Sequence, residues 1–280
     1  MSPRPARHAR PGSNREGVIT ASTATTALVG GGASGIGRAT AEHLAHDGWD
    51  VVLVGRTEER LRATASELTA KNGRDVRWAV GDLGDADAAD DLVADVEDRF
   101  GELAVLVLNT GGPRPARILD LDADDWRDGA ELLLVGPLAV ARNVVVGMQE
   151  RGFGRVVLVT GTAVRQPMPE LALSTVLRSA ATAAMKLLAG EVAADGVTVN
   201  CVAPGPVATD RRAQIVANRA ATAGVSTEQA DADDLAVVPA GRAGEPGEVA
   251  AAIAFLASRD AGYVTGTVLT VDGGRTETTW

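Results

Sequence analysis

Short apolar runs alternate along the chain with longer stretches in which apolar residues recur at helical spacing. Runs that are apolar throughout are typical of strands buried on both faces of a sheet. The predicted strands are Thr26–Gly30, Asp50–Val54, Val76–Val80, Ala104–Leu108, Arg155–Thr160, Val197–Val202 and Val268–Val271. The predicted helices cover residues 35–47, 57–70, 85–99, 123–150, 173–194 and 245–258. This alternation predicts one α/β domain of Rossmann type, with a doubly wound parallel sheet and helices on both faces.

The two remaining parts of the chain have a different character. Residues 207–244 are polar and alanine-rich, and they lie between the sixth strand and the last helix. In an open α/β sheet such an excursion lies over the ligand crevice, so we predict a helical lid there. Residues 1–24 are rich in Arg, Pro, Ser and Thr. They predict a disordered N-terminal extension, followed by the folded domain over residues 25–280.

Composition narrows the possible partners. The 280 residues are 45% hydrophobic but only 3% aromatic, so Ala, Val and Leu must build the core. The net charge of −10 argues against nucleic acid or an anionic membrane as a partner. One cysteine and three histidines offer few metal ligands, and we expect no metal site. We find no stretch approaching the roughly 18 apolar residues that span a bilayer, and we expect a cytoplasmic protein.

A glycine cluster joins the first predicted strand to the first predicted helix. It reads as G-x-G-x-x-G through Gly30, Gly32 and Gly35, or as G-x-x-x-G-x-G through Gly31, Gly35 and Gly37. Glycines allow a tight turn and a close approach to a pyrophosphate, which the N–H groups of the new helix then bind. The cluster therefore predicts a dinucleotide site; the alternative is a glycine-rich turn without a ligand.

The end of the second strand indicates which dinucleotide binds. A carboxylate at that point accepts hydrogen bonds from a ribose 2′-hydroxyl. Here the strand ends Val54-Gly55-Arg56, and Arg38 follows the glycine turn. Two guanidiniums suit a 2′-phosphate, so NADP(H) is favoured over NAD(H), unless both are solvated charges at helix ends. Asp82 is either an acceptor for the adenine amino group or a helix N-cap.

Further motifs carry a family resemblance. They are Gly81-Asp82-Leu83, Leu108-Asn109-Thr110-Gly111, Asn200-Cys201-Val202-Ala203-Pro204-Gly205 followed by Thr209, and Val271-Asp272-Gly273-Gly274. From about Thr26 to Gly274 the chain resembles the classical short-chain dehydrogenase/reductases, and within them a 3-oxoacyl-carrier-protein reductase. The cofactor contacts that the residues and the resemblance together imply are Gly31, Ser34, Gly35, Ile36, Gly37, Arg38, Arg56, Asp82, Leu83, Asn109, Gly111, Arg178, Pro204, Gly205, Val207 and Thr209.

The catalytic positions of that family are occupied differently here. Its Ser, Tyr, Lys and Asn positions fall on Gly161, Ser174, Arg178 and Leu133, and the only tyrosine of the chain is Tyr263. A serine hydroxyl is far less acidic than a tyrosine hydroxyl, and an arginine stays protonated. We therefore expect an atypical active site.

The catalytic candidates of that atypical site are Ser174, Arg178 and Thr162, with Thr160 as an alternative hydroxyl. Arg178 is also available to hold the ribose hydroxyls of the cofactor. Two of these hydroxyl residues have a structural interpretation as well: Thr160 as the end of a strand, and Ser174 as a helix cap.

Other charged residues follow the carboxyl ends of strands, where ligands bind in such sheets. Arg114, Arg117 and Arg165 lie in loops after the fourth and fifth strands. They suit an anionic substrate, such as a carboxylate or phosphopantetheine, or are exposed loop charges. Glu170 is the only carboxylate between Gly161 and Arg178, which makes it the candidate acid or base of that segment.

Three functions follow from these features. The first is an NADP(H)-dependent oxidoreductase acting on a carbonyl or alcohol, with a small-molecule or acyl-thioester substrate. The second is a non-redox cyclase or isomerase on the same scaffold, and the third is an inactive cofactor-binding partner subunit. The alanine-rich helix 173–194 permits close packing, and the resemblance implies that it forms a subunit interface. We expect a homo-oligomer, a dimer or tetramer.

Overall fold

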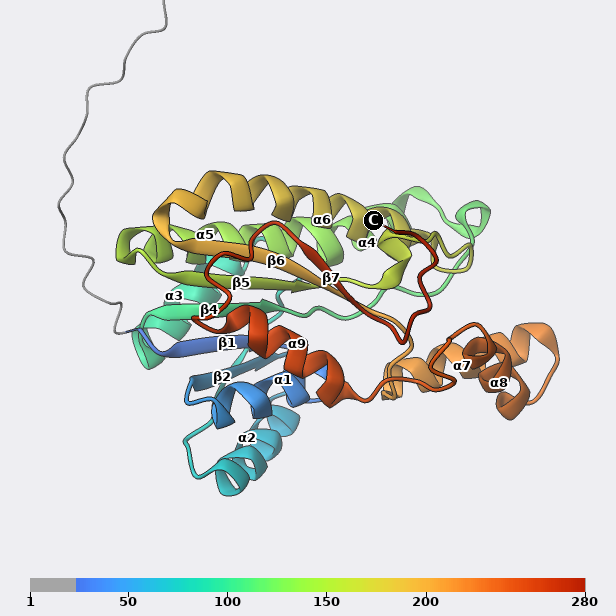
Figure 1. Cartoon of the computed structure of the whole chain (residues 1–280), viewed down its shortest axis with the longest axis horizontal. Helices are drawn as coiled ribbons and strands as arrows, with labels where there is room; N and C mark the ends of the chain where they lie inside the picture. The colour runs from blue at the N-terminus through green and yellow to red at the C-terminus, as the bar shows by residue number, and fades with distance from the viewer. Residues whose placement is uncertain (1–23, 280) are drawn as a thin grey trace, which may run out of the picture.

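A seven-stranded parallel sheet forms the centre of the molecule. The computed structural model describes residues 24–279, and the strand order is β3-β2-β1-β4-β5-β6-β7 (Figure 1). Every pairing is parallel. The strands are β1 (Thr26–Gly30), β2 (Asp50–Gly55), β3 (Arg77–Val80), β4 (Leu103–Leu108), β5 (Gly154–Val159), β6 (Val197–Pro204) and β7 (Val268–Val271). The predicted doubly wound fold is confirmed; β1 and β7 match the predicted bounds, and the other five strands differ from the prediction only at their ends.

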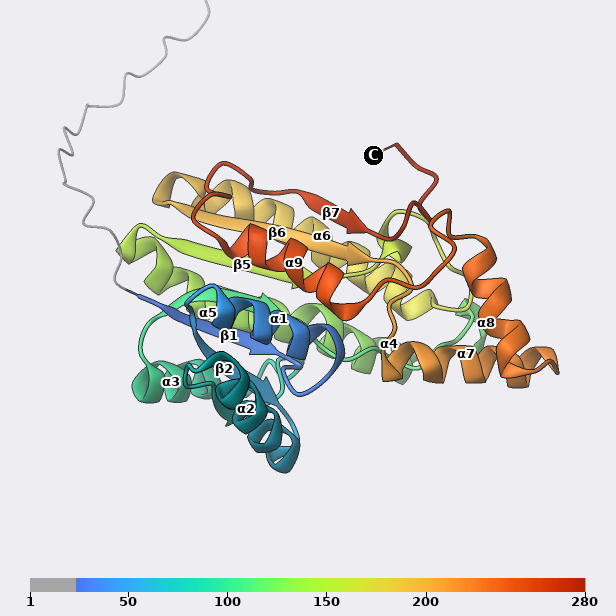
Figure 2. The ribbon, with the colours of Figure 1, turned by 60° about the horizontal axis from the view of Figure 1, so that its bottom comes forward.

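Helices cover both faces of the sheet (Figures 1 and 2). The α-helices are α1 (Gly35–His46), α2 (Glu58–Asn72), α3 (Ala89–Phe100), α4 (Ala123–Ala130), α5 (Gly136–Arg151), α6 (Ala172–Val192), α7 (Asp210–Ala223), α8 (Thr227–Ala236) and α9 (Pro246–Ala257). On one face Leu44 of α1, Leu61 of α2 and Ile253 of α9 pack on the strands. On the other, Leu92 of α3 and Met185 of α6 belong to a second cluster, to which α5 also contributes.

The predicted helix 123–150 is three segments. A π-helical turn over Glu131–Val135 separates α4 from α5, and Pro137 stands in the first turn of α5. Within the run Ala123–Arg151 an 18-residue window has a mean hydropathy of 1.5, which by length and composition alone suffices to cross a membrane. The sequence analysis missed this. The buried residues of α5, Val140 and Met148 among them, belong to the core against the sheet, which accounts for the apolar composition.

One predicted helix begins later in the structure than the sequence predicts, for a local reason. The helix predicted from residue 85 begins at Ala89. Before it, Asp82 accepts hydrogen bonds from the N–H of Gly84 and, through its carbonyl, from that of Asp85. Asp82 therefore closes a turn and caps no helix.

The predicted N-terminal extension lies outside the described residues except for Ala24, which is buried near Ala104 and Phe153.

Residues 207–244 contain α7 and α8. Val216, Ala220 and Ala230 form a small core between these two helices. Both ribbon views place the pair beyond the carboxyl ends of the strands, apart from the helices that cover the sheet (Figures 1 and 2). The pair therefore stands at the edge where ligands bind in parallel sheets.

The glycine turn is held by contacts between backbone groups. Gly31 has a φ of +59°, in the left-handed region. A Cβ on Gly37 would lie 2.3 Å from the carbonyl oxygen of Gly31 and 2.7 Å from that of Gly30. Asn109, which follows β4, donates from its side-chain amide to the carbonyl of Gly30 at 3.1 Å. The turn therefore has no room for side chains at these points.

We expect Gly37→Ala to lower the free energy of unfolding by about 2 kcal/mol, because the methyl group would meet backbone that cannot give way. Gly247, also in a first helical turn, has only an ordinary contact with His43 at 3.8 Å. Gly247→Ala should raise stability by roughly 0.5 kcal/mol, since alanine favours helix over glycine. Thermal and urea unfolding measure both variants. Equal stability of the two would contradict the packing argument.

Candidate active site

Two adjoining cavities run along the carboxyl ends of the strands. The larger has a volume of about 410 Å³ and the smaller about 310 Å³. Both are lined by Gly31, Ser34, Asn109 and the loop after β4. They meet between β1 and β4, the point at which the strand order reverses and where such folds bind nucleotides. Together they form one trough.

The smaller cavity has a basic rim. Arg56 and Arg60 line it, together with Asp82 and Leu83. The guanidinium of Arg56 lies 3.8 Å from the carboxylate of Asp82. Arg60, in the first turn of α2 and four residues after Arg56, was missed in the sequence analysis. Its closeness to Arg56 in the sequence was the available signal. Arg38 pairs with Glu67 at 2.7 Å.

Arg38 also lines a different cavity, beside Glu42 and Asp210. The two guanidiniums predicted to share a phosphate, those of Arg38 and Arg56, therefore do not share a cavity.

The start of α1 faces the junction of the two cavities. Ser34 is the N-cap residue, but its hydroxyl makes no capping hydrogen bond, and the first turn holds no acidic residue. This helix end thus keeps N–H groups and a positive dipole for an anion. Fourteen of the predicted cofactor contacts line one cavity or both. They are Gly31, Ser34, Gly35, Ile36, Arg56, Asp82, Leu83, Asn109, Gly111, Arg178, Pro204, Gly205, Val207 and Thr209.

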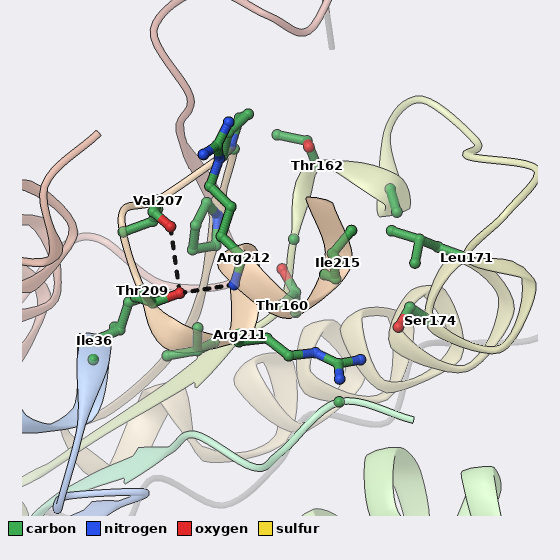
Figure 3. A pocket seen from close by; sticks show the side chains of 18 of the residues that line it. Ile36, Thr160, Thr162, Leu171, Ser174, Val207, Thr209, Arg211, Arg212 and Ile215 are labelled. Carbon is green, nitrogen blue, oxygen red and sulfur yellow. Dashed lines mark hydrogen bonds between the residues drawn. The ribbon is translucent and has the colours of Figure 1, made fainter. Parts of the chain in front are cut away.

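The three predicted catalytic residues, Ser174, Arg178 and Thr162, all line the larger cavity, and Figure 3 shows Ser174 and Thr162 there. Ser174 is the third residue of α6, whose N-cap is Leu171, so it caps no helix. Thr162 is buried in the loop after β5. Thr160 donates its hydroxyl to the carbonyl of Val202 at 3.1 Å. This bond agrees with the interpretation of Thr160 as the end of a strand.

Arg178 bridges two strand ends. Its guanidinium donates to the carbonyl oxygens of Val159 at 2.8 Å and Gly111 at 3.1 Å. Burial, and then the positive charge of Arg211, lower the pKa of Arg178 to about 10. The group is therefore charged at neutral pH.

The other positions of the family tetrad carry no polar side chain. Leu133, in the π-helical turn, is buried against Leu173 and Leu177. Gly161 has extended backbone, and a Cβ there would meet only the carbonyl oxygen of Pro204, at 3.9 Å. Tyr263 is fully exposed, ahead of β7, and lines neither cavity of the trough.

Two of the three loop arginines predicted to bind an anion have other partners. Arg114 binds both carboxylate oxygens of Asp125, at 2.8 and 2.5 Å, and this hydrogen bonding lowers the pKa of Asp125. Arg165 donates to the carbonyl of Val268. Neither these two nor Arg117 lines the trough. The structure therefore does not bring these three arginines to the trough.

Arginines of the predicted lid and the C-terminal segment, missed in the sequence analysis, do line the larger cavity: Arg211, Arg212, Arg219 and Arg275. Asp234 of α8, whose side chain is 6% exposed, pairs with the last three at 3.1, 2.5 and 3.6 Å. The remaining acid candidate, Glu170, pairs with Arg219 at 2.5 Å. In the sequence, the adjacent Arg211 and Arg212 after Thr209 were the available signal for these missed arginines.

The fold and trough define a class: α/β proteins that bind a dinucleotide at the switch point of a parallel sheet. The family model described as Enoyl-(Acyl carrier protein) reductase matches residues 31–276. The 3-oxoacyl-(acyl-carrier-protein) reductase of Haemophilus influenzae is 34% identical over 248 residues, which cover 89% of this chain and 96% of that protein.

Solved structures of similar proteins support the same class. A variant of actinorhodin polyketide ketoreductase with NADPH has a TM-score of 0.86 and 35% identity, covering 91% of this chain and 98% of its own. L-Sorbose reductase from Gluconobacter frateurii, complexed with NADPH and L-sorbose, has a TM-score of 0.84 and 32% identity, covering 91% and 97%. The chain belongs to the short-chain dehydrogenase/reductase family of oxidoreductases, and within it is similar to the 3-oxoacyl-carrier-protein reductases.

We expect Asp234→Ala to lower the free energy of unfolding by about 3 kcal/mol, because it removes the largely buried carboxylate that Arg212, Arg219 and Arg275 share. The loss should appear first as faster proteolysis within α7 and α8. The neighbouring Asp233 is exposed and serves as the control. Asp233→Ala should behave as the wild type, and equal sensitivity of both variants would show that the network does not hold the helix pair.

Proposed function

We propose that this protein is an NADP(H)-dependent oxidoreductase that acts on a carbonyl or alcohol with an atypical active site. One observation carries the proposal: a single trough joins the basic rim at Arg56 and Arg60, the glycine turn, and the cavity that holds Ser174, Thr162 and Arg178. The 3-oxoacyl-carrier-protein reductase relative and the NADPH-bound neighbours support it.

The residues of the trough fit the cofactor. The turn at Gly31 leaves no space for side chains, and the uncapped start of α1 offers N–H groups for the pyrophosphate. Arg56 and Arg60 suit the 2′-phosphate of the adenosine ribose, and no carboxylate ends β2. Arg178 suits the ribose near the nicotinamide, since it spans the ends of β4 and β5.

The bound cofactor supplies a hydride to the carbonyl carbon, or accepts one from the alcohol. In reduction, the carbonyl oxygen gains negative charge, which the guanidinium of Arg178 stabilises. Ser174 and Thr162 orient that oxygen and pass it a proton, which water replaces. Because no tyrosine lies in the cavity, we expect turnover slower by 10²–10⁴-fold than with a matched general acid.

A cofactor-binding subunit without turnover is the second candidate. Leu133 and Gly161 favour it, because hydrocarbon or open space stands where the family has polar groups. Both functions are compatible with a homo-oligomer, a dimer or tetramer, built through α6. Val176 and Leu187 of this helix are 47% and 70% exposed, an apolar surface suited to a second copy of the chain.

We expect Arg56→Ala and Arg60→Ala each to weaken NADPH binding by about tenfold and to leave NADH binding unchanged, because only NADPH carries the 2′-phosphate. Quenching of tryptophan emission measures both affinities. Arg38→Ala is the comparison: its ion pair with Glu67 predicts a smaller effect. Absence of any NADPH binding would overturn the proposed function.

A second experiment tests the active site by restoring the family residues. Gly161→Ser, Ser174→Tyr and Arg178→Lys together should raise NADPH turnover on ketones and β-ketoacyl thioesters by at least about tenfold. Ser174→Ala in the wild type should lower turnover. Unchanged turnover in that variant removes Ser174 from the mechanism, and no measurable wild-type turnover with tight NADPH binding favours the inactive subunit.

A further inference from the structure

The arginines of the larger cavity fall into two electrostatic sets. Arg212, Arg219 and Arg275 share Asp234, and the first two also reach Asp231 and Glu170. These three guanidiniums therefore meet three carboxylates. Their charges are balanced within the protein, and they contribute little net potential to a ligand.

Arg178 and Arg211 form the second set. Among residues 24–279 neither makes an ion pair. Arg178 donates to the carbonyls of Val159 and Gly111, and Arg211 donates to that of Pro113 at 2.5 Å. The two are close enough for the charge of Arg211 to lower the pKa of Arg178, and burial lowers that of Arg211. Two like charges thus line one wall of the cavity without a counter-ion.

The position of Arg211 is defined by the loop after β4. A Cβ on Gly112 would lie 3.0 Å from Nη2 and 3.1 Å from Nε of Arg211, so the guanidinium rests against bare backbone. Figure 3 shows this side chain extending from α7 toward α6, where Ser174 lies. A guanidinium has five N–H donors. The single hydrogen bond to Pro113 leaves donors available for a ligand.

Apolar side chains also line the cavity. Met168 and Leu171 precede α6, and Ile215 lies one turn into α7. A ligand that matches both the arginines and these apolar side chains has an anionic group and a hydrocarbon body. The planar fork of a guanidinium pairs with the two oxygens of a carboxylate. A neutral thioester would leave the charge of Arg211 without a partner, which is costly in a half-buried site.

We propose that Arg211, which lies beside Arg178, binds the carboxylate of the substrate, and that the substrate is a compact keto acid or hydroxy acid with an apolar body. This rests on the proposed oxidoreductase function, and it adds a residue outside the family tetrad that selects the substrate. The reacting carbon then lies between the carboxylate, held at Arg211, and the hydroxyl of Ser174.

The test compares two probes that share a carbon body. 2-Oxohexanoate carries a carboxylate where 2-hexanone carries a methyl group. Calorimetry on the NADP⁺-saturated protein should show 2-oxohexanoate binding at least about tenfold more tightly than 2-hexanone, as expected for charge-assisted hydrogen bonds. Arg211→Gln should remove that preference by weakening the binding of the acid alone, and Arg211→Lys should restore part of it.

Arg114→Gln is the matched control, because it removes the same charge from a loop arginine that Asp125 already neutralises. It should bind both probes as the wild type does. Thermal unfolding and NADPH affinity of Arg211→Gln should equal those of the wild type, which separates loss of the site from loss of the fold. Equal affinity for both probes, no saturable binding of the acid, or equal losses in Arg211→Gln and Arg114→Gln would overturn the inference.

The outcomes also separate this inference from the proposed function. If NADPH binds and the acid does not, the carboxylate site is refuted and the oxidoreductase proposal stands. If NADPH fails to bind while the cofactor-free protein retains the Arg211-dependent preference for the acid, the oxidoreductase proposal fails and the anion site stands.

Discussion

The close approach of two backbone segments in the glycine turn is the constraint on which the rest of the structure depends. Gly37, in the first turn of α1, lies so near the carbonyl of Gly31 that no side chain fits between them. Asn109 ties the same turn to the end of β4. Because of these contacts, the start of α1 faces the trough. The Asn109 bond also links the ends of β1 and β4, where the strand order reverses. Both cavities open from this point.

The arginines of the trough differ in whether a carboxylate neutralises them, and this difference separates structural from ligand-facing arginines. Asp234 neutralises the arginines that hold α7, α8 and the C-terminal segment together, so these ion pairs act as structure. Arg178 and Arg211 bind only carbonyl oxygens, so their charges remain directed at the cavity. The same residue type serves two purposes in one site, and the position of a single buried carboxylate decides which arginine serves which purpose.

The sequence predicted the fold well because strands buried on both faces must be apolar throughout. The run at β1, buried along its whole length, matches the structure at both ends, and so does that of the partly buried edge strand β7. It also grouped most of the trough residues, because they follow the carboxyl ends of neighbouring strands. It failed for the arginines. Whether Arg114 meets Asp125, or Arg212 meets Asp234, depends on side-chain directions and on segments far apart in the chain. The π-helical turn at Leu133 was missed because one inserted residue hardly alters an apolar pattern.

The small core between α7 and α8 has a consequence for how the cavity responds to its surroundings. Val216, Ala220 and Ala230 pack with one another and not with the sheet, and a partly exposed ion pair between Arg219 and Glu170 links α7 to the loop before α6. Dissolved salt screens such pairs but leaves apolar packing intact. Added salt therefore weakens this one link between α7 and the loop before α6, whereas the apolar core of the helix pair and the largely buried pairs of Asp234 are affected much less.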